Sequence, residues 1–181
     1  MRNSKTKKYL ITALMAAVIA ILSPFSFMIP ISPVPISLAT FAIYLTTYIL
    51  GAKYSAISTM IYVILGMVGL PVFTGFTGGM GKVLGPTGGY IISYVFLAII
   101  AGLIIEKNYD NIVICFVGMF AGTIILYLVG TLWLAFVTNM TFRAALFAGV
   151  VPFIIGDIAK MIMACIIGNR VRNALVRANY L

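Results

Sequence analysis

The chain has 181 residues, of which 63% are hydrophobic and 8% are charged. A soluble domain usually carries about a quarter charged residues, and a chain this short has too small an interior to hide so much apolar surface. The net charge is +9, with no histidine and three acidic residues, which excludes most catalytic and metal-binding constellations. The composition predicts an all-α integral membrane protein in which residues 1–181 form a single domain.

Six apolar spans are predicted along the chain. The first is interpreted as a retained helix, because its apolar run is longer than that of a signal peptide. Three prolines, Pro30, Pro33 and Pro35, separate it from the second span. A tight turn at 51–53 separates the second span from the third, which stops at Pro71. The predicted spans are 9–28, 36–50, 54–70, 88–105, 111–137 and 148–170.

Counts of lysine and arginine predict that both termini are cytoplasmic, in a multi-pass protein of the cell membrane. In this orientation only Lys82 and Arg143 fall in outer loops, whereas the reverse orientation would place most basic residues outside. Basic residues at chain ends and loops are typical of membrane anchors, so nucleic acid is not an expected partner. The residues expected on the cytoplasmic side are Arg2, Lys5, Lys7, Lys8, Lys53, Lys107, Arg170, Arg172 and Arg177.

The predicted connections differ between the two sides of the membrane. The inner ones are short and polar, whereas the outer ones, 30–35, 71–86 and 139–147, are long, rich in Gly and Pro and still apolar. Irregular backbone is not tolerated in contact with lipid, so these segments must pack on protein or line a cavity. We interpret them as lids over an outward-facing pocket.

The segment 75–90 holds seven glycines, which let backbone groups approach a ligand closely. A phosphate-binding P-loop is excluded, because Phe76 replaces the first required glycine and Val83 replaces the Ser or Thr that would reach magnesium. The segment is either a structural tight loop or a substrate-contacting loop. In the second interpretation, substrate-binding candidates here are Gly78, Gly79, Thr87 and Tyr90.

Asp157 and Lys160 lie inside the sixth apolar run, and a spacing of three places them on one helical face. A charge at membrane depth costs about 2.5–3.5 kcal/mol on insertion scales, which pairing partly offsets. The two residues form either a structural ion pair or a ligand site. Aromatic residues near the outer face include Tyr44 and Trp133. Trp133 either stacks on a flat ligand or belongs to the interfacial belt.

Four alanines in the first span form two small-xxx-small pairs, Ala13 with Ala17 and Ala16 with Ala20. Small residues let membrane helices approach closely. The pairs serve either packing within the chain or docking to another membrane subunit.

Together these residues resemble the BioY family, the biotin-binding S-components of energy-coupling-factor (ECF) transporters. The resemblance rests on PVPI at 33–36, LGPTGGY at 84–90 and GDIAK at 156–160, and it spans nearly the whole chain. It implies six helices, capture of biotin as substrate from outside, no cofactor and no enzymatic activity. The implied partners are an ECF transmembrane coupling protein, which would meet the small residues of the first helix, and two ATP-binding-cassette ATPases.

The resemblance carries over Asp157 and Lys160 as binding residues. The family often has Gln and Thr where this chain has Ala39 and Thr40, which leaves Thr40 as the candidate in the second span. We expect Asp157 or backbone carbonyls to meet the urea N–H groups of biotin, and Lys160 or loop N–H groups to meet an oxygen. The alternatives are an S-component for another vitamin and a stand-alone secondary transporter, although the latter usually has more embedded acids and repeated halves. A membrane enzyme is disfavoured by the lack of histidine.

Overall fold

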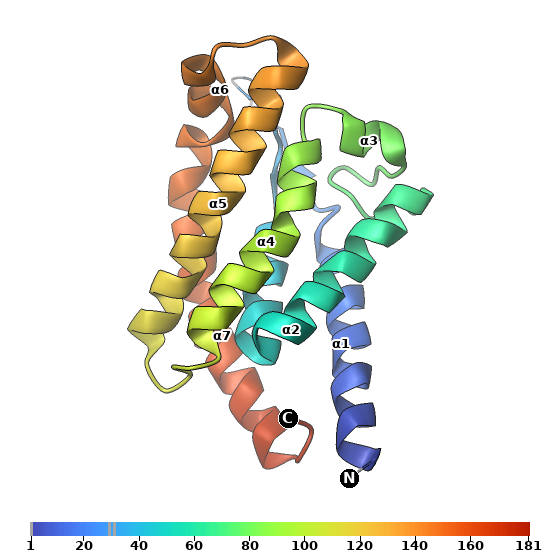
Figure 1. The fold of residues 1–181 in the computed structure, drawn as a ribbon, viewed down its shortest axis with the longest axis vertical. Coiled ribbons are helices and arrows are strands. Elements are labelled where there is room, and N and C mark those ends of the chain that lie inside the picture. Colours follow the sequence, from blue (N-terminus) through green and yellow to red (C-terminus); the bar gives the residue numbers. More distant parts are fainter. Residues whose placement is uncertain (1, 29, 31) are drawn as a thin grey trace.

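The computed structural model describes residues 2–28, 30 and 32–181. Long helices stand side by side, and both chain ends lie at the same end of the bundle (Figure 1). The long helices are α1 (Arg2–Leu22), α2 (Ala39–Val68), α4 (Gly88–Ile105), α5 (Ile112–Thr138) and α7 (Ile154–Arg177). Shorter elements are β1 (Ser26–Phe27), β2 (Ile36–Ser37), α3 (Met80–Leu84), α6 (Phe142–Gly149) and the 3₁₀ turn η1 (Val151–Phe153).

Helix α2 breaks at Gly51, which has φ 71° and ψ −170°. The chain turns back there, so that each half of α2 is a separate helix of the bundle (Figure 1). A positive φ favours glycine, and a Cβ atom at this position would lie 2.9 Å from Oε2 of Glu106. The predicted turn is thus confirmed, and with α2 counted as two helices the described residues form six long helices.

Charged side chains satisfy the backbone on both sides of this break. Arg172 Nη1 donates to the carbonyl of Ile49 at 2.7 Å, and the N–H of Ala52 donates to Oε2 of Glu106 at 3.0 Å. Each charge has the sign that the adjacent helix end prefers, positive at a C-terminus and negative at an N-terminus. The two contacts bring α4 and α7 against the turn of α2.

The predicted first span, 9–28, is wrong at its end, because α1 stops at Leu22. Pro24 disfavours a helical conformation in the residue before it. The following segment instead forms a short antiparallel hairpin, with Ser26 opposite Ser37 and Phe27 opposite Ile36. Within the predicted proline-rich link, residues 29 and 31 lie outside the described residues.

The predicted sixth span, 148–170, is displaced toward the C-terminus. Pro152 lies in the turn η1, and α7 begins only after it and continues to Arg177. Basic residues continue the helix because arginine is a good helix former and suits a helix C-terminus. The outer connection 139–147 contains α6, whose first turn is capped by Thr141, and α3 likewise forms within 71–86.

With the two halves of α2 counted together, four helical segments of the described residues are long and apolar enough to cross a membrane: Ala39–Val68, Gly88–Ile105, Ile112–Thr138 and Phe142–Arg177. Helix α1 is not among them because lysines occupy its first turns. Its apolar part, 9–22, is roughly 21 Å long at 1.5 Å per residue. The prediction of an all-α membrane protein is therefore confirmed, with fewer long apolar spans than the six expected.

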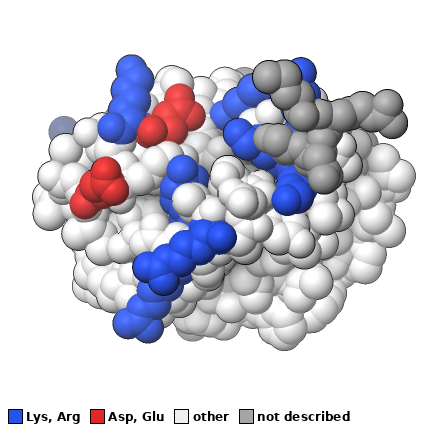
Figure 2. Space-filling model, turned by 90° about the horizontal axis from the view of Figure 1, so that it is seen from below, with Lys and Arg blue, Asp and Glu red and all other residues white. Residues whose placement is uncertain are grey.

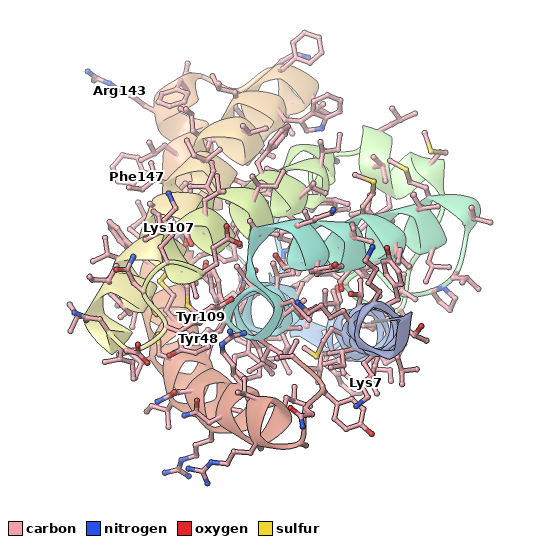
Figure 3. The ribbon with its side chains drawn as sticks, turned by 60° about the horizontal axis from the view of Figure 1, so that its bottom comes forward. Lys7, Tyr48, Lys107, Tyr109, Arg143 and Phe147 are labelled. Carbon is pink, nitrogen blue, oxygen red and sulfur yellow. The ribbon has the colours of Figure 1, made fainter. Side chains whose placement is uncertain are left out.

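Basic side chains gather on the end of the bundle that carries both termini (Figure 2). Lys7 joins the two termini there, because its Nζ atom donates to the carbonyl of Asn179 at 3.1 Å. Figure 3 shows Lys7, Lys107 and Tyr109 toward this end, whereas Arg143 on α6 lies at the far end. The charge distribution therefore distinguishes the two ends of the bundle, and we call the end with the termini the basic end.

Close packing of α4 on α2 depends on Gly102. A Cβ atom at this position would lie 2.5 Å from the backbone nitrogen of Ala52, next to the helix break. We expect Gly102→Ala to lower the thermal unfolding midpoint in detergent, because overpacking of this kind costs about 1–3 kcal/mol. The matched control is Gly156→Ala in α7, where a Cβ atom meets nothing within 4 Å. Equal midpoints for both variants would contradict the packing role of Gly102.

Candidate functional site

A buried polar network joins α2, α5 and α7. Oδ1 of Asp157 accepts hydrogen bonds from Lys160 Nζ at 2.9 Å and from Thr40 Oγ1 at 3.1 Å. Oδ2 of Asp157 accepts from the hydroxyl of Tyr127 at 2.7 Å, and Lys160 Nζ also donates to Thr40 Oγ1 at 3.0 Å. Asp157 is 4% exposed and Lys160 8%. The charges are therefore paired and hydrogen-bonded, as burial in a membrane protein requires.

Each member of the network is positioned by its own element. Asp157 and Lys160 are three residues apart near the start of α7, as the sequence predicts. Thr40 lies in the first turn of α2, directly after the hairpin, and Tyr127 lies in the middle of α5. The sequence reasoning missed Tyr127. The signal available was a hydroxyl group in the middle of an apolar helix, where a polar group needs a partner.

The network borders a small internal cavity of about 40 Å³. Four of the predicted substrate-binding residues line it, namely Thr40, Tyr90, Asp157 and Lys160. Pockets that enclose drug-sized ligands typically measure about 300–1,000 Å³. The cavity is smaller than such pockets. Further lining residues, which the sequence did not single out as substrate-binding, are Val34, Pro35, Ser37, Tyr94, Leu126, Tyr127, Gly149 and Phe153.

Tyr90 closes one side of the cavity between α5 and α6. Its hydroxyl donates to the carbonyl of Gly149 at 3.0 Å. Side chains larger than glycine do not fit around the ring, because a Cβ atom at Gly130 or Gly149 would overlap Tyr90. Tyr90 is thus fixed in place by its neighbours while still facing the cavity.

The other predicted substrate-binding residues do not line this cavity. Tyr44 is fully buried, and its hydroxyl bonds to Thr123 Oγ1 at 2.6 Å. Trp133 Nε1 donates to the carbonyl of Gly85 at 2.9 Å, which fastens the end of the glycine-rich segment to α5. Thr87 is the N-cap residue of α4.

The two remaining candidates, Gly78 and Gly79, lie against the end of α2. The N–H of Gly79 donates to the carbonyl of Gly66 at 2.7 Å. Gly79 has φ 91°, and a Cβ atom at Gly78 would overlap the carbonyl of Leu70. The glycines at these two positions therefore allow the chain to turn tightly over α2.

The four alanines of α1 differ in how exposed they are. Ala16 is 2% exposed and Ala20 packs against the core, so this pair faces the interior of the bundle. Ala13 and Ala17 are exposed on the adjoining side of the helix. Packing within the chain therefore uses one small-residue pair, while the other remains accessible.

The hydrogen-bonding capacity of the network is almost filled. A carboxylate accepts at about four lone-pair positions and an ammonium group donates three hydrogens. Asp157 accepts three hydrogen bonds and Lys160 donates two. This leaves one acceptor position on Oδ2 of Asp157 and one donor on Lys160. Such a site suits a neutral group in which an N–H lies beside a C=O.

Comparisons with known proteins identify the family. Residues 1–177 match the sequence model of the BioY family. The chain is 34% identical over 179 residues to the "Biotin transporter BioY2" of Lactococcus lactis subsp. cremoris, which covers 99% of this chain and 97% of the relative. It is 39% identical over 168 residues to the "Probable biotin transporter BioY" of Pyrococcus horikoshii, covering 93% and 98%.

A solved structure agrees with this assignment. The crystal structure of the S-component for biotin from an ECF-type ABC transporter matches with a TM-score of 0.88 and 34% identity. The match covers 96% of this chain and 94% of the other. The resemblance seen in the sequence motifs is confirmed: the chain belongs to the BioY family of biotin transporters.

Proposed function

We propose that the protein is the substrate-capture subunit of an ECF transporter, binding biotin from the extracellular side. It would deliver biotin across the membrane together with an ATP-driven coupling module. Family membership supports this proposal, since the chain matches biotin transporters and the S-component for biotin over nearly its full length. The chain belongs to a transporter family and is not an enzyme.

The observation that carries the substrate assignment is the unused capacity of the polar network. Biotin has a cyclic urea in which each N–H lies beside the C=O. The free acceptor position of Asp157 matches one urea N–H, and the free donor of Lys160 matches the urea oxygen. No bond of the network has to break for these two contacts to form. The network therefore offers a preorganised site for the urea edge.

The rest of the cavity suits the apolar part of biotin. Leu126, Phe153 and Tyr94 supply apolar and aromatic surface next to the network. Ligand pockets are usually of this kind, with a few convergent polar groups in an apolar wall. The thioether ring and the valerate chain would occupy the space that opens when this wall moves outward.

The basic end of the bundle supports a cytoplasmic location for both termini. Lysine and arginine are enriched in cytoplasmic segments of membrane proteins, and they gather at the end that carries the termini. The cavity lies near η1 and the start of α7, toward the opposite end. In this orientation the biotin site is reached from outside the cell.

The coupling partner would meet the exposed pair Ala13 and Ala17. This pair is exposed on α1, and small residues at this spacing allow a second helix to approach closely. We propose an ECF transmembrane coupling protein as that partner, with two ATP-binding-cassette ATPases attached to it.

Titration calorimetry of the detergent-purified protein tests the substrate. Biotin should release heat of binding, whereas riboflavin and thiamine should not. In the same assay Asp157→Asn and Lys160→Ala should each weaken biotin binding about tenfold or more, because each loses hydrogen bonds to a charged group. The control is Tyr62→Phe, which removes a buried hydroxyl that bonds Ser23 outside the cavity. Heat with another vitamin but not with biotin would overturn the substrate, and unchanged affinity in both site variants would overturn the site.

Thiol labelling of intact cells tests the orientation. The natural cysteines, Cys115 and Cys165, are buried and give little background. A membrane-impermeant maleimide should label Arg143→Cys on α6 and should label Ala178→Cys only after the cells are opened. Labelling of Ala178→Cys in intact cells would reverse the orientation.

Copurification tests the partner surface. Ala17→Trp should prevent copurification with the coupling protein and its ATPases, because the indole ring would hold the partner helix away. Biotin affinity should stay unchanged, since Ala17 lies outside the cavity. The matched control is Val117→Trp on the exposed face of α5. Retention of the partner by Ala17→Trp would exclude this face of α1 as the contact.

A further inference from the structure

Tyr127 lies at a boundary between two cavities. On one side is the small internal cavity, and on the other is an apolar groove of about 140 Å³ between α5 and α7. Tyr127 and Asp157 line both of them. The groove is otherwise bordered by side chains such as Ile124 and Ile154, which are exposed on the outside of the bundle. The contact between Tyr127 and Asp157 therefore forms part of the wall between the internal cavity and the lipid side.

This contact is also the main polar link between the two helices. Across the part of the chain that the structure describes, the hydrogen bond from Tyr127 to Asp157 is the one bond between oxygen atoms that joins α5 to α7. The remaining contact of this kind is a weak one between sulfur atoms, from Cys165 to Met119 at 4.0 Å. A single hydroxyl group thus supplies the hydrogen bond that links Asp157 to α5.

The hydroxyl group also determines how the carboxylate is turned. The terminal torsion of an aspartate is broad, so neighbouring donors decide its orientation. Thr40 and Lys160 both bind Oδ1, and Tyr127 alone binds Oδ2. Without the Tyr127 hydroxyl, Oδ2 would have two free acceptor positions and the carboxylate plane would be held at one oxygen only.

We propose that Tyr127 is a positioning residue that sets substrate specificity: it holds Oδ2 of Asp157 so that the carboxylate presents a single, fixed acceptor to a ligand N–H. This role rests on the proposed binding of a cyclic urea. A fixed acceptor strengthens the binding of a ligand that has an N–H group opposite it. It weakens the binding of a ligand that has a methyl group there, because the buried acceptor is then left without a hydrogen bond.

This role is tested with biotin and its 1′-N-methyl and 3′-N-methyl derivatives, each of which lacks one urea N–H; the derivative that the unsubstituted protein binds more weakly is the methylated compound of the test. The unsubstituted protein should bind biotin more tightly than the methylated compound. Tyr127→Phe should weaken biotin about tenfold, the effect of one hydrogen bond that involves a charged group. The affinity of this variant for the methylated compound should change less than about threefold. The ratio of the affinities for biotin and for the methylated compound should therefore be smaller than in the unsubstituted protein.

An equal loss of affinity for both compounds would mean that Tyr127 acts on packing alone and would overturn the proposal, as would unchanged affinity for both. Tyr62→Phe is the matched control, because it removes a buried tyrosine hydroxyl that also has a side-chain partner, Ser23 at 2.5 Å. The ratio of its affinities for biotin and for the methylated compound should equal that of the unsubstituted protein. Failure of the unsubstituted protein to bind biotin would instead count against the proposed function.

Infrared spectroscopy tests the contact without any ligand. The chain has two aspartates, Asp110 and Asp157, so carbon-13 labelling of aspartate isolates two carboxylate bands. Tyr127→Phe should shift the band of Asp157, because Oδ2 loses its donor, and Tyr62→Phe should shift neither band. An unshifted band in Tyr127→Phe would overturn the proposal, whatever the variant does to biotin binding.

Discussion

The ion pair between Asp157 and Lys160 is the interaction on which the site depends. Each charge at membrane depth costs several kcal/mol unless it is paired and hydrogen-bonded. One partner cannot satisfy the carboxylate, so Thr40 and Tyr127 supply further donors from α2 and α5. Three helices that are distant in sequence are thereby held around one acidic side chain. The physical need to satisfy a buried charge thus creates the polar wall of the cavity.

A second set of charges stabilises the basic end of the bundle by a different principle. There the chain turns at Gly51 and exposes the backbone groups of two helix ends. Glu106 accepts from one side of the break and Arg172 donates to the other. Arg172 also lies 3.3 Å from the centre of the Tyr109 ring. The two ends of the molecule therefore use their few charged contacts differently: one set forms the polar wall of a cavity, and the other fixes the helices.

The sequence predicted those features of the fold and the site that neighbouring residues in the chain determine. Asp157 and Lys160 could be found because a charged pair at helical spacing contrasts with an apolar run, and the turn at Gly51 could be found because it is short and polar. Hydropathy alone failed at the end of α1, since the chain stays apolar after Pro24 although the helix has ended. Tyr127 was missed because an aromatic residue in an apolar span is usually a packing residue, and its partner lies 30 residues away.

In the proposed biotin site, recognition of the urea and accommodation of the rest of the ligand would be separate problems. The polar network is complete apart from one donor and one acceptor, so a urea edge can bind it without breaking a hydrogen bond. The cavity of about 40 Å³ would nevertheless have to enlarge to hold biotin. The residues that can yield are the apolar ones, such as Leu126 and Phe153, because they form no hydrogen bond to the network. In the proposed site, a polar wall held by hydrogen bonds and an apolar wall free of them would allow selection of a ligand by its hydrogen bonds while the cavity changes volume around it.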